Sequence, residues 1–258
     1  SDRGKVYSER VYELTEAKRT DKGIPPVDLI ALEPGEHITA ALAVPDFKSA
    51  EFITFATIHG IMKRVALSEF ASVRPSGLIA IGLKEGDELG WVRLTSGQDE
   101  IILVTVNGQA LRIKEEDVRV TGRPGRGVIG IRFKDGDRLA SMEIVEPDGS
   151  LLVVTENGFG KRTSLGKYRT LGRGSRGPAT INRKFLKSIG KIVSARIVQE
   201  DDQVTLISNS GKVIRLKVKD ISHSGRVTKG VRLMNLNKGD NVSSIARIKK
   251  LKSKGPLV

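Results

Sequence analysis

A short basic motif, Arg-x-x-(Lys/Arg)-Gly, recurs along the chain in what the sequence predicts to be loops. Arginine offers a planar fork that forms two parallel hydrogen bonds with phosphate oxygens, and lysine offers a point charge. The closing glycine permits a tight turn that brings backbone N–H groups close to an anion. A single copy indicates only a solvated turn, whereas copies in register favour phosphate binding. The copies are RTDKG at 19–23, RPGRG at 123–127, RGSRG at 173–177 and RVTKG at 226–230, with a remnant, RPSG, at 74–77.

A second group of cations lies on predicted strands. Four glycines at predicted hairpin turns are each followed four positions later by arginine, and two of these arginines are preceded by lysine. Such side chains either contact nucleic acid or form a solvated outer face or a cross-strand ion pair, and the sequence leaves both interpretations open. The arginines are Arg64, Arg112, Arg162 and Arg215, and the lysines are Lys63 and Lys161.

The composition indicates a polyanionic partner. The 258 residues include 44 Lys and Arg against 30 Asp and Glu, a net charge of +14, and such an excess attracts nucleic acids and anionic surfaces. The sequence contains no basic amphipathic helix, and its apolar runs are far shorter than the roughly 20 residues that span a bilayer, so we expect no membrane partner. Aromatic residues make up only 4%, which disfavours single-strand binding by base stacking. A nucleic acid, DNA or RNA, is therefore the expected partner, and a ring of loops that contact phosphates favours double-stranded DNA bent around the protein.

The sequence predicts a binding protein rather than an enzyme. It has neither a phosphate-loop signature nor the glycine signature of a dinucleotide-binding fold. Its three histidines are scattered and it has no cysteine, so we expect no catalytic residue, metal, cofactor or disulfide. Residues 1–20 are highly charged and unlike a secretory signal, which predicts a cytoplasmic, nucleoid-associated protein. The residues expected to bind DNA are Arg19, Lys22, Lys63, Arg64, Arg74, Arg112, Arg123, Arg126, Lys161, Arg162, Arg173, Arg176, Arg215, Arg226 and Lys229.

The elements that carry these loops repeat along the chain. The hairpin glycines Gly60, Gly108, Gly158 and Gly211 close short β-branched runs and are separated by 48, 50 and 53 residues. A second series of turns, mostly Gly-Asp, alternates with them, so each repeat holds four short strands. This pattern predicts an all-β β-propeller or β-pinwheel of four-stranded blades forming a single domain over 1–258. Five blades are visible, at 2–45, 51–97, 100–147, 149–199 and 202–249.

Several stretches together resemble the C-terminal domain of the bacterial DNA gyrase A subunit. They are FITFATIHGIMKRVALSEF, GLIAIGLKEGDEL, LLVVTENGFGKRTSLGKY and GRVTKGVRLMNLNKGDNV. The resemblance, which covers nearly the whole chain, implies a six-bladed β-pinwheel whose blades exchange strands. It also implies chiral wrapping of DNA around a basic perimeter in support of negative supercoiling. The partners would be the gyrase B subunit, together with the remainder of the gyrase A subunit. ATP hydrolysis and DNA cleavage would lie outside this chain.

The sequence departs from the family at its hallmark, the box Gln-Arg-Arg-Gly-Gly-(Lys/Arg)-Gly of the first blade. The nearest stretch is LGRGSRG at 171–177, in the fourth visible blade. Aligned with the family, the visible blades match its second to sixth. Topoisomerase IV has a related domain with a degenerate box, and its substrate-selecting domain is one alternative. A propeller that serves as an interaction platform for an acidic protein is another. Steep salt dependence and indifference to DNA sequence would favour DNA binding.

Overall fold

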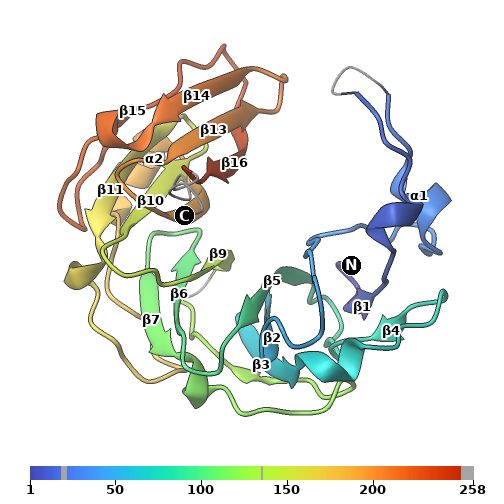
Figure 1. Ribbon diagram of the computed structural model, residues 1–258. Helices are drawn as coiled ribbons and strands as arrows, with labels where there is room; N and C mark the ends of the chain where they lie inside the picture. Colours follow the sequence, from blue (N-terminus) through green and yellow to red (C-terminus); the bar gives the residue numbers. More distant parts are fainter. Residues whose placement is uncertain (19–21, 135, 251–258) are drawn as a thin grey trace, which may run out of the picture. The chain divides into compact units, whose positions relative to one another are not determined.

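The computed structural model describes residues 1–18, 22–134 and 136–250. These residues form small antiparallel sheets with only short helical turns between them, as Figure 1 shows. The chain divides into two compact units, of which unit 1 consists of residues 1–98 and 118–130. Unit 2 consists of residues 99–117 and the residues from 131 onward. The predicted all-β fold class is confirmed.

Unit 1 contains a two-stranded and a four-stranded sheet. The smaller sheet pairs β1 (Lys5–Val6) with β4 (Leu78–Ile79). The larger has the strand order β5-β2-β3-β8, and Gly60 closes its β2–β3 hairpin at a φ of +76°. A positive φ is accessible to glycine without a steric penalty, which explains the residue at this turn. The strands of the larger sheet are β2 (Phe52–Thr57), β3 (Ile61–Ala66), β5 (Leu89–Thr95) and β8 (Val128–Ile129).

Unit 2 contains three sheets, with the strand orders β7-β6-β9, β12-β10-β11-β15 and β14-β13-β16. The hairpin glycines of these sheets also have positive φ angles, as the sequence predicts for such turns. The strands are β6 (Glu100–Thr105), β7 (Ala110–Lys114), β9 (Leu139–Ile144), β10 (Ser150–Thr155), β11 (Phe159–Ser164), β12 (Ile192–Val198), β13 (Gln203–Ser208), β14 (Val213–Lys217), β15 (Val231–Arg232) and β16 (Val242–Ile248).

The helical elements are single turns. A 3-10 turn follows the second strand of each long hairpin, where it redirects the chain toward the basic loop. Among the described residues, no helix is long and apolar enough to cross a membrane. The 3-10 turns are η1 (Val11–Glu13), η2 (Leu67–Phe70), η3 (Glu115–Asp117), η4 (Leu165–Lys167), η5 (Arg183–Phe185) and η6 (Val218–Asp220), and the α-helices are α1 (Pro26–Leu29) and α2 (Leu186–Ile189).

Each four-stranded sheet takes its last strand from the following repeat. In unit 1, β8 comes from the repeat at 100–147 and pairs with β3 of the repeat at 51–97. In unit 2, β15 of the last repeat pairs with β11 of the repeat before it. A repeat therefore contributes three longer strands to its own sheet and one short strand to its neighbour's. This is the strand exchange that the family resemblance implies, and it refines the expectation that one repeat forms one complete blade.

A glycine at the end of the basic motif makes this exchange sterically possible. Gly127, Gly177 and Gly230 all have positive φ angles. A Cβ atom at these positions would lie 2.4 to 2.5 Å from a backbone carbonyl oxygen of the preceding repeat's second strand. Any larger residue would push the short strand away from the sheet it completes. The motif glycine therefore permits the close crossing of two backbones, and the approach of its loop to phosphate stays a prediction.

The strand β10 is buried on both faces. Leu151 and Val153 belong to a core cluster with residues of the repeat at 100–147, whereas Leu152 and Val154 belong to a cluster with residues of the last repeat. All four side chains are at most 1% exposed. A strand sandwiched between neighbouring sheets has no polar face, which explains why LLVV runs without hydrophobic–polar alternation.

In three of the described repeats, the aspartate of the Gly-Asp turn accepts a hydrogen bond from the hairpin turn of the same repeat. The Asp87 carboxylate accepts a hydrogen bond of 3.2 Å from the backbone N–H of His59, in the turn between β2 and β3. Asp137 accepts a hydrogen bond of 2.9 Å from the backbone N–H of Asn107 in the same way, and Asp240 accepts one of 3.1 Å from the backbone N–H of Ser210. These carboxylates satisfy backbone donors that the tight turns leave unpaired, so their role is structural.

The described residues of the first repeat, 2–45, form only part of a blade. Its described residues contribute the strand β1 together with η1 and α1. Pro25 and Pro26 have no N–H to donate to a ladder. Residues 38–44 correspond to β5 of the next repeat, which pairs with β2. Among the described residues up to 45 there is no strand equivalent to β2, and residues 38–44 take part in no described sheet. The predicted blade boundary therefore encloses only part of a sheet.

The glycine crossing yields a stability prediction. Gly177→Ala combines an unfavourable φ of +70° with a Cβ only 2.4 Å from the Ala110 carbonyl oxygen. We expect it to lower the free energy of unfolding by at least about 1–2 kcal/mol. Gly172→Ala, at an exposed position of the same loop with no atom within 4 Å of the added Cβ, is the matched control and should change it by less than about 0.5 kcal/mol. Urea denaturation measures both, and equal effects would contradict the crossing.

An ion-pair network in unit 2 yields a prediction on pH. Arg247 on β16 donates to both oxygens of Glu146, at 2.7 and 2.9 Å, and Lys249 donates to Glu146 at 2.9 Å. Burial raises the pKa of Glu146, but the hydrogen bonds from Arg247 and Lys249 outweigh it and lower the pKa from 4.5 to about 2. Because the folded chain then binds this proton more weakly than the unfolded chain, the stabilisation is present above about pH 4.5 and is lost as the pH falls toward 2.

Replacing Glu146 by Gln should remove this dependence. The difference in free energy of unfolding between wild type and Glu146→Gln is expected to shrink as the pH is lowered from 5 toward 3. This range lies roughly between the pKa values of Glu146 in the unfolded and the folded chain. Glu116→Gln, at an exposed glutamate paired with Lys114, is the control and should show no such trend. Parallel pH profiles for wild type and Glu146→Gln would rule out the network's role.

Candidate nucleic-acid interface

The basic loops lie at the junctions between successive repeats. Each described loop directly precedes the short segment that joins the preceding sheet, so its position is set by strand exchange. In the first repeat, Lys22 is exposed, whereas Arg19 falls outside the described residues. Residues 74–77 precede β4, residues 123–127 precede β8, residues 173–177 precede the bridge of Ala179 to Gln109, and residues 226–230 precede β15.

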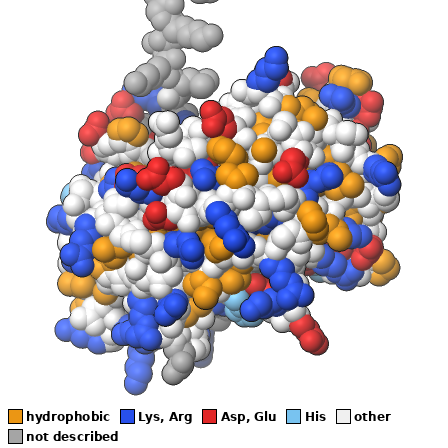
Figure 2. Space-filling model, turned by 90° about the horizontal axis from the view of Figure 1, so that it is seen from below, with side chains coloured by type: hydrophobic (Ala, Val, Ile, Leu, Met, Phe, Trp, Pro, Cys, Tyr) orange, Lys and Arg blue, Asp and Glu red, His pale blue; other side chains and the backbone are white. Residues whose placement is uncertain are grey.

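Most cations of these loops face solvent. A charged fork or ammonium that is exposed but mounted on a short turn can bind a phosphate at a low cost in side-chain entropy. Figure 2 shows Lys and Arg side chains spread over one face of the molecule, with acidic side chains between them. The exposed loop cations are Lys22, Arg74, Arg126, Arg173 and Arg176, and the half-buried ones are Arg123, Arg226 and Lys229.

Local contacts orient several of these cations. The Nε of Arg123 lies 3.8 Å from the Glu69 carboxylate, which also accepts a hydrogen bond of 3.4 Å from the Arg123 backbone N–H. The Nε of Arg173 donates to the Asp117 carbonyl at 2.8 Å. In the last repeat, the Lys229 ammonium lies 5.0 Å from the centre of the Phe159 ring, within range of a cation–π interaction. The loops are therefore anchored against neighbouring elements rather than extending freely into solvent.

The strand arginines Arg112 and Arg162 bind the following repeat instead of facing outward. Arg162 is 8% exposed and donates to the carbonyl oxygens of Ile221 at 2.8 Å and Lys219 at 3.1 Å. It also forms an ion pair with Glu200, and its hydrogen bond lowers the pKa of that carboxyl below the ordinary value. These carbonyls belong to the 3-10 turn η6 and the residue after it, so the guanidinium serves as a clamp across the junction.

Arg112 and Arg64 occupy the same register with related contacts. Arg112 donates to the carbonyl oxygens of Leu165 at 3.3 Å and Tyr168 at 3.4 Å, around η4 of the next repeat, and pairs with Glu100. Arg64 is 8% exposed, donates to the Gly97 carbonyl at 3.3 Å and stacks 4.6 Å from the Phe52 ring centre. We predicted DNA contacts for these arginines, and the structure places their guanidinium groups at intramolecular contacts because the exchanged segment covers this side of the strand.

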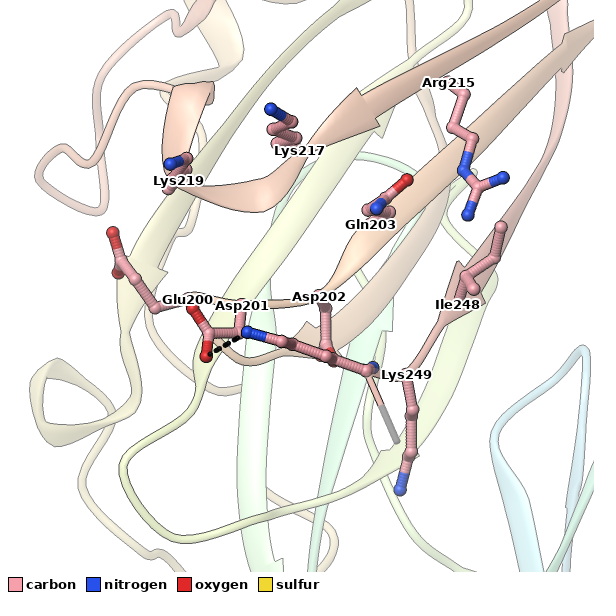
Figure 3. A pocket seen from close by; sticks show the side chains of 10 residues that line it. Glu200, Asp201, Asp202, Gln203, Arg215, Lys217, Lys219, Ile248 and Lys249 are labelled. Atoms are coloured by element: carbon pink, nitrogen blue, oxygen red, sulfur yellow. Dashed lines mark hydrogen bonds and ion pairs between the residues drawn. The ribbon is translucent and has the colours of Figure 1, made fainter. Parts of the chain in front are cut away.

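Arg215 is the exposed member of this register. It lies on β14, the outer strand of its three-stranded sheet, and takes part in lining a pocket of about 350 Å³. Figure 3 shows Arg215 and Lys217 on β14, with Lys219 just beyond it, along one wall and acidic side chains along the other. Arg215 therefore stays a candidate for contact with a polyanion.

The acidic wall of this pocket is already paired with cations. Asp201 forms an ion pair of 3.4 Å with Lys250, drawn in Figure 3, and Asp202 one of 2.7 Å with Arg247. The remaining carboxylate of the wall, Glu200, pairs with Arg162. The cations of the wall formed by β14 are therefore more accessible to a polyanion than the cations paired with the acidic wall. Among the described residues, no group of three or more His, Cys, Asp or Glu side chains is arranged to hold a metal ion.

Lys63 and Lys161 lie in the interior. Both side chains are 0% exposed, although we predicted that they contact DNA. Lys63 donates to the carbonyl oxygen of Ala80 at 2.8 Å and to that of Arg123, and Lys161 donates to the carbonyl oxygens of Gly225 and Arg226. The structure thus places both ammonium groups beneath the basic loops rather than on their outer side.

Two exposed arginines near the loops were missed in the sequence analysis. Arg119 and Arg169 are both exposed, and each lies four residues before the first arginine of a basic motif. The residues that follow them form parallel bridges to the preceding repeat, Val120 to Arg64 and Thr170 to Arg112. The signal was present in the shared spacing of VRVTGR and YRTLGR. Both arginines extend the positive surface beside the loops.

The contrast between Arg162 and Arg215 can be tested directly. Arg162→Met leaves the carbonyls of Ile221 and Lys219 without their donor, and we expect the free energy of unfolding to fall by about 2–4 kcal/mol. Arg215→Met removes an exposed arginine in the same register and should change it by no more than about 0.5 kcal/mol. Chemical denaturation of both variants makes the comparison, and similar losses would contradict the assignment of Arg162 as a clamp.

The chain has relatives among known proteins. A family model described as "DNA gyrase C-terminal domain, beta-propeller" matches residues 1–45, 51–96, 99–146, 149–199 and 202–249. The DNA gyrase A subunit of Halalkalibacterium halodurans is 52% identical over 248 residues, which cover 96% of this chain and 30% of the relative. The chain thus spans about a third or less of the length of the curated relatives that it matches.

Solved structures agree with this match. A DNA gyrase A C-terminal domain superposes with a TM-score of 0.84 at 28% identity, covering 96% of this chain and 80% of that one. A C-terminal domain of DNA topoisomerase IV superposes with a TM-score of 0.88 at 28% identity, covering 96% of this chain and 77% of that one. The family resemblance and the propeller fold expected from the sequence are confirmed. The chain belongs to the DNA gyrase C-terminal domain family of β-propellers.

Proposed function

We propose that this chain binds double-stranded DNA through the basic loops at its repeat junctions and bends the duplex along them. The observation that carries the proposal is the recurrence of outward-facing arginines at equivalent junctions, as at Arg74, Arg126 and Arg176. A net charge of +14 supplies long-range attraction for a polyanion. Arg119 and Arg169 add positive charge beside these loops, and Arg215 is a further exposed arginine on β14.

The contacts would be with phosphates rather than with base edges. Loops of this length present guanidinium groups at the surface, and phosphate contacts of this kind position DNA without reading its sequence. Reading the major groove generally requires an inserted helix or a two-stranded ribbon. The described helices are single turns, and the long hairpins are parts of three- and four-stranded sheets rather than free ribbons, which supports binding that is indifferent to sequence.

The duplex has to bend if it contacts the basic loops of several junctions at once. A duplex that touches loops of successive repeats has to follow the surface on which they are mounted, and the bend costs of order 1–6 kcal/mol for roughly 20–30 base pairs. Additional phosphate contacts can offset that cost. We infer that the five repeats act as one DNA-wrapping domain over 1–258, with Lys22, Arg123, Arg173, Arg226 and Lys229 completing the contacts.

Within a complete enzyme, such a domain would present a wrapped segment for strand passage. We propose that it is the non-catalytic wrapping part of an ATP-dependent type II topoisomerase in the cytoplasm, associated with the nucleoid. Its partners would be a gyrase B subunit, together with the remainder of a gyrase A subunit. The similarity to gyrase A subunits over 96% of this chain supports this assignment.

Neutralising the loops tests the phosphate contacts. The quadruple change of Arg123, Arg126, Arg173 and Arg176 to Ala should weaken binding to all DNA sequences alike. The slope of log K against log salt should become shallower by about 0.9 for each phosphate that the variant no longer neutralises, up to about 3.6 in total. Fluorescence anisotropy with duplexes of unrelated sequence, measured over a range of salt concentrations, gives both quantities.

A matched quadruple variant separates loop contacts from net charge. Lys84, Lys134, Lys187 and Lys238 are exposed and lie at or near the second-series turns of their repeats. Their change to Ala removes the same formal charge away from the basic loops. We expect a smaller effect on both affinity and slope. Equal effects of the two quadruple variants would show that overall charge, and not the loops, governs binding.

A topoisomerase IV-type role is the second candidate, favoured by the TM-score of 0.88 to that C-terminal domain. The roles can be distinguished by sealing nicked circular DNA in the presence of the chain. A shift in linking number that grows with protein concentration would support chiral wrapping. Binding without a shift would favour bending or substrate selection. Salt-insensitive or undetectable DNA binding would instead favour a protein-interaction platform.

A further inference from the structure

Two of the four long hairpins carry a buried lysine beside the junction. Lys63 on β3 and Lys161 on β11 lie three residues after the hairpin glycine and are 0% exposed. The same position holds Leu111 on β7 and Ile214 on β14. Leu111 is also 0% exposed, which shows that an apolar side chain fits the interior at this register. The fold alone therefore does not require lysine there.

The buried lysines bind the basic loop of the next repeat from beneath. The Lys161 ammonium donates to two consecutive carbonyl oxygens, those of Gly225 and Arg226. Lys63 donates to the carbonyl oxygen of Arg123, the first arginine of its loop, and to that of Ala80 next to β4. In both repeats the contact spans about 60 residues of sequence and ends on the loop that carries the exposed cations.

Burying these ammonium groups costs free energy that their neighbours only partly offset. Carbonyl oxygens carry only partial negative charge, and desolvation lowers the pKa of both lysines to about 8. Glu69 raises the pKa of Lys63, and it also contacts Arg123, whereas the nearby Lys167 further lowers that of Lys161. Burial of a charged ammonium group at two equivalent positions costs free energy in each repeat. We therefore expect these lysines to have a function other than filling the interior.

The geometry of the peptide group suggests what that role is. In a trans peptide the N–H points away from the C=O. When Lys161 draws the carbonyls of Gly225 and Arg226 inward, the N–H groups of Arg226 and Val227 turn outward, where an anion can meet them. Lys63 binds the carbonyl of Arg123, and the residue after Arg123 is Pro124, which has no N–H. Lys63 therefore holds only the backbone from which the Arg123 and Arg126 side chains extend.

We infer that Lys63 and Lys161 are positioning residues, which hold the loops at 123–127 and 225–230 in the conformation that binds phosphate without touching DNA themselves. The inference rests on the proposed DNA-binding function. It extends that function by making two interior side chains determinants of affinity. The loop at 173–177, which follows the hairpin with Leu111, lacks this support and is held by other contacts, such as that of Arg173 with the Asp117 carbonyl.

A double-mutant cycle in the full chain tests the inference. Lys161→Met should lower affinity for duplex DNA and make the salt slope shallower by up to about 1.8, the value for two phosphates. In a background that already carries Arg226→Ala and Lys229→Ala, Lys161→Met should lower affinity much less, because the side chains that it positions are gone and only the backbone N–H groups of Arg226 and Val227 are left to be displaced. A general loss of stability would lower affinity equally in both backgrounds, and that additive result would overturn the inference.

Hydrogen exchange provides a readout without DNA. In Lys161→Met, the amides of Ser224 and Thr228, which donate hydrogen bonds to the carbonyl oxygens of Arg162 and Gly225, should exchange faster, while those of β10 and β13 should keep their rates. Unchanged exchange in the loop would overturn the inference even if DNA binding falls. Leu111→Met, a volume-conserving change at the same register, is the control and should alter neither exchange nor affinity.

The outcomes also separate this inference from the proposed function. If the wild-type chain fails to bind duplex DNA in anisotropy, the proposed function is wrong, and hydrogen exchange still decides whether Lys161 positions its loop. If Lys161→Met does not fold, Lys63→Met with Arg123→Ala and Arg126→Ala repeats the cycle in unit 1. Normal wild-type binding with an additive cycle would leave the proposed function standing and remove the role of the lysines.

Discussion

The close backbone crossings at Gly127, Gly177 and Gly230 are the constraint on which the other features of the junctions depend. Each brings a short segment of one repeat onto the second strand of the repeat before it, at a separation that leaves no room for a Cβ. Where strands form, the crossing completes the neighbour's sheet. It also fixes the basic loop, because the glycine is the last residue of that loop. One steric requirement therefore governs both how the sheets are completed and where the exposed arginines lie.

The cations at these junctions form two groups, one buried in contacts that stabilise the fold and one exposed to solvent. Cations on the second strands lie under the exchanged segment, where Arg162 binds carbonyls of η6 and Lys161 binds carbonyls of the loop. Cations within the loops, such as Arg126 and Arg176, face solvent. The two groups differ little in residue type, and what separates them is whether the following repeat covers them. Arg215 illustrates this, because it shares the register of Arg162 and is exposed on the outer strand β14.

The repeat, the turns and the fold class could be predicted from the sequence because they depend on local patterns. Glycines such as Gly60 and Gly108 indicate turns wherever a positive φ is needed, and their spacing gives the period. The partner of each short strand could not be derived from such patterns, since Ile129 pairs with Ile61, which lies more than one full repeat earlier in the chain. Only the family resemblance implied the exchange. Nor could the burial of Lys63 be predicted. Its strand is packed on both faces, so hydrophobic alternation gives no sign of which side chains reach solvent.

Strand exchange also bears on how such a chain can change length during evolution. The strands β3 and β11 offer the same kind of edge to the short strand that arrives from the next repeat, β8 in one case and β15 in the other. An in-frame duplication or loss of one whole unit would therefore join compatible edges at the new boundary. A duplication that began midway through a repeat would preserve this match as well, provided that it spanned one full period. The heritable requirement is thus the distance between successive crossings, while the number of units is free to vary.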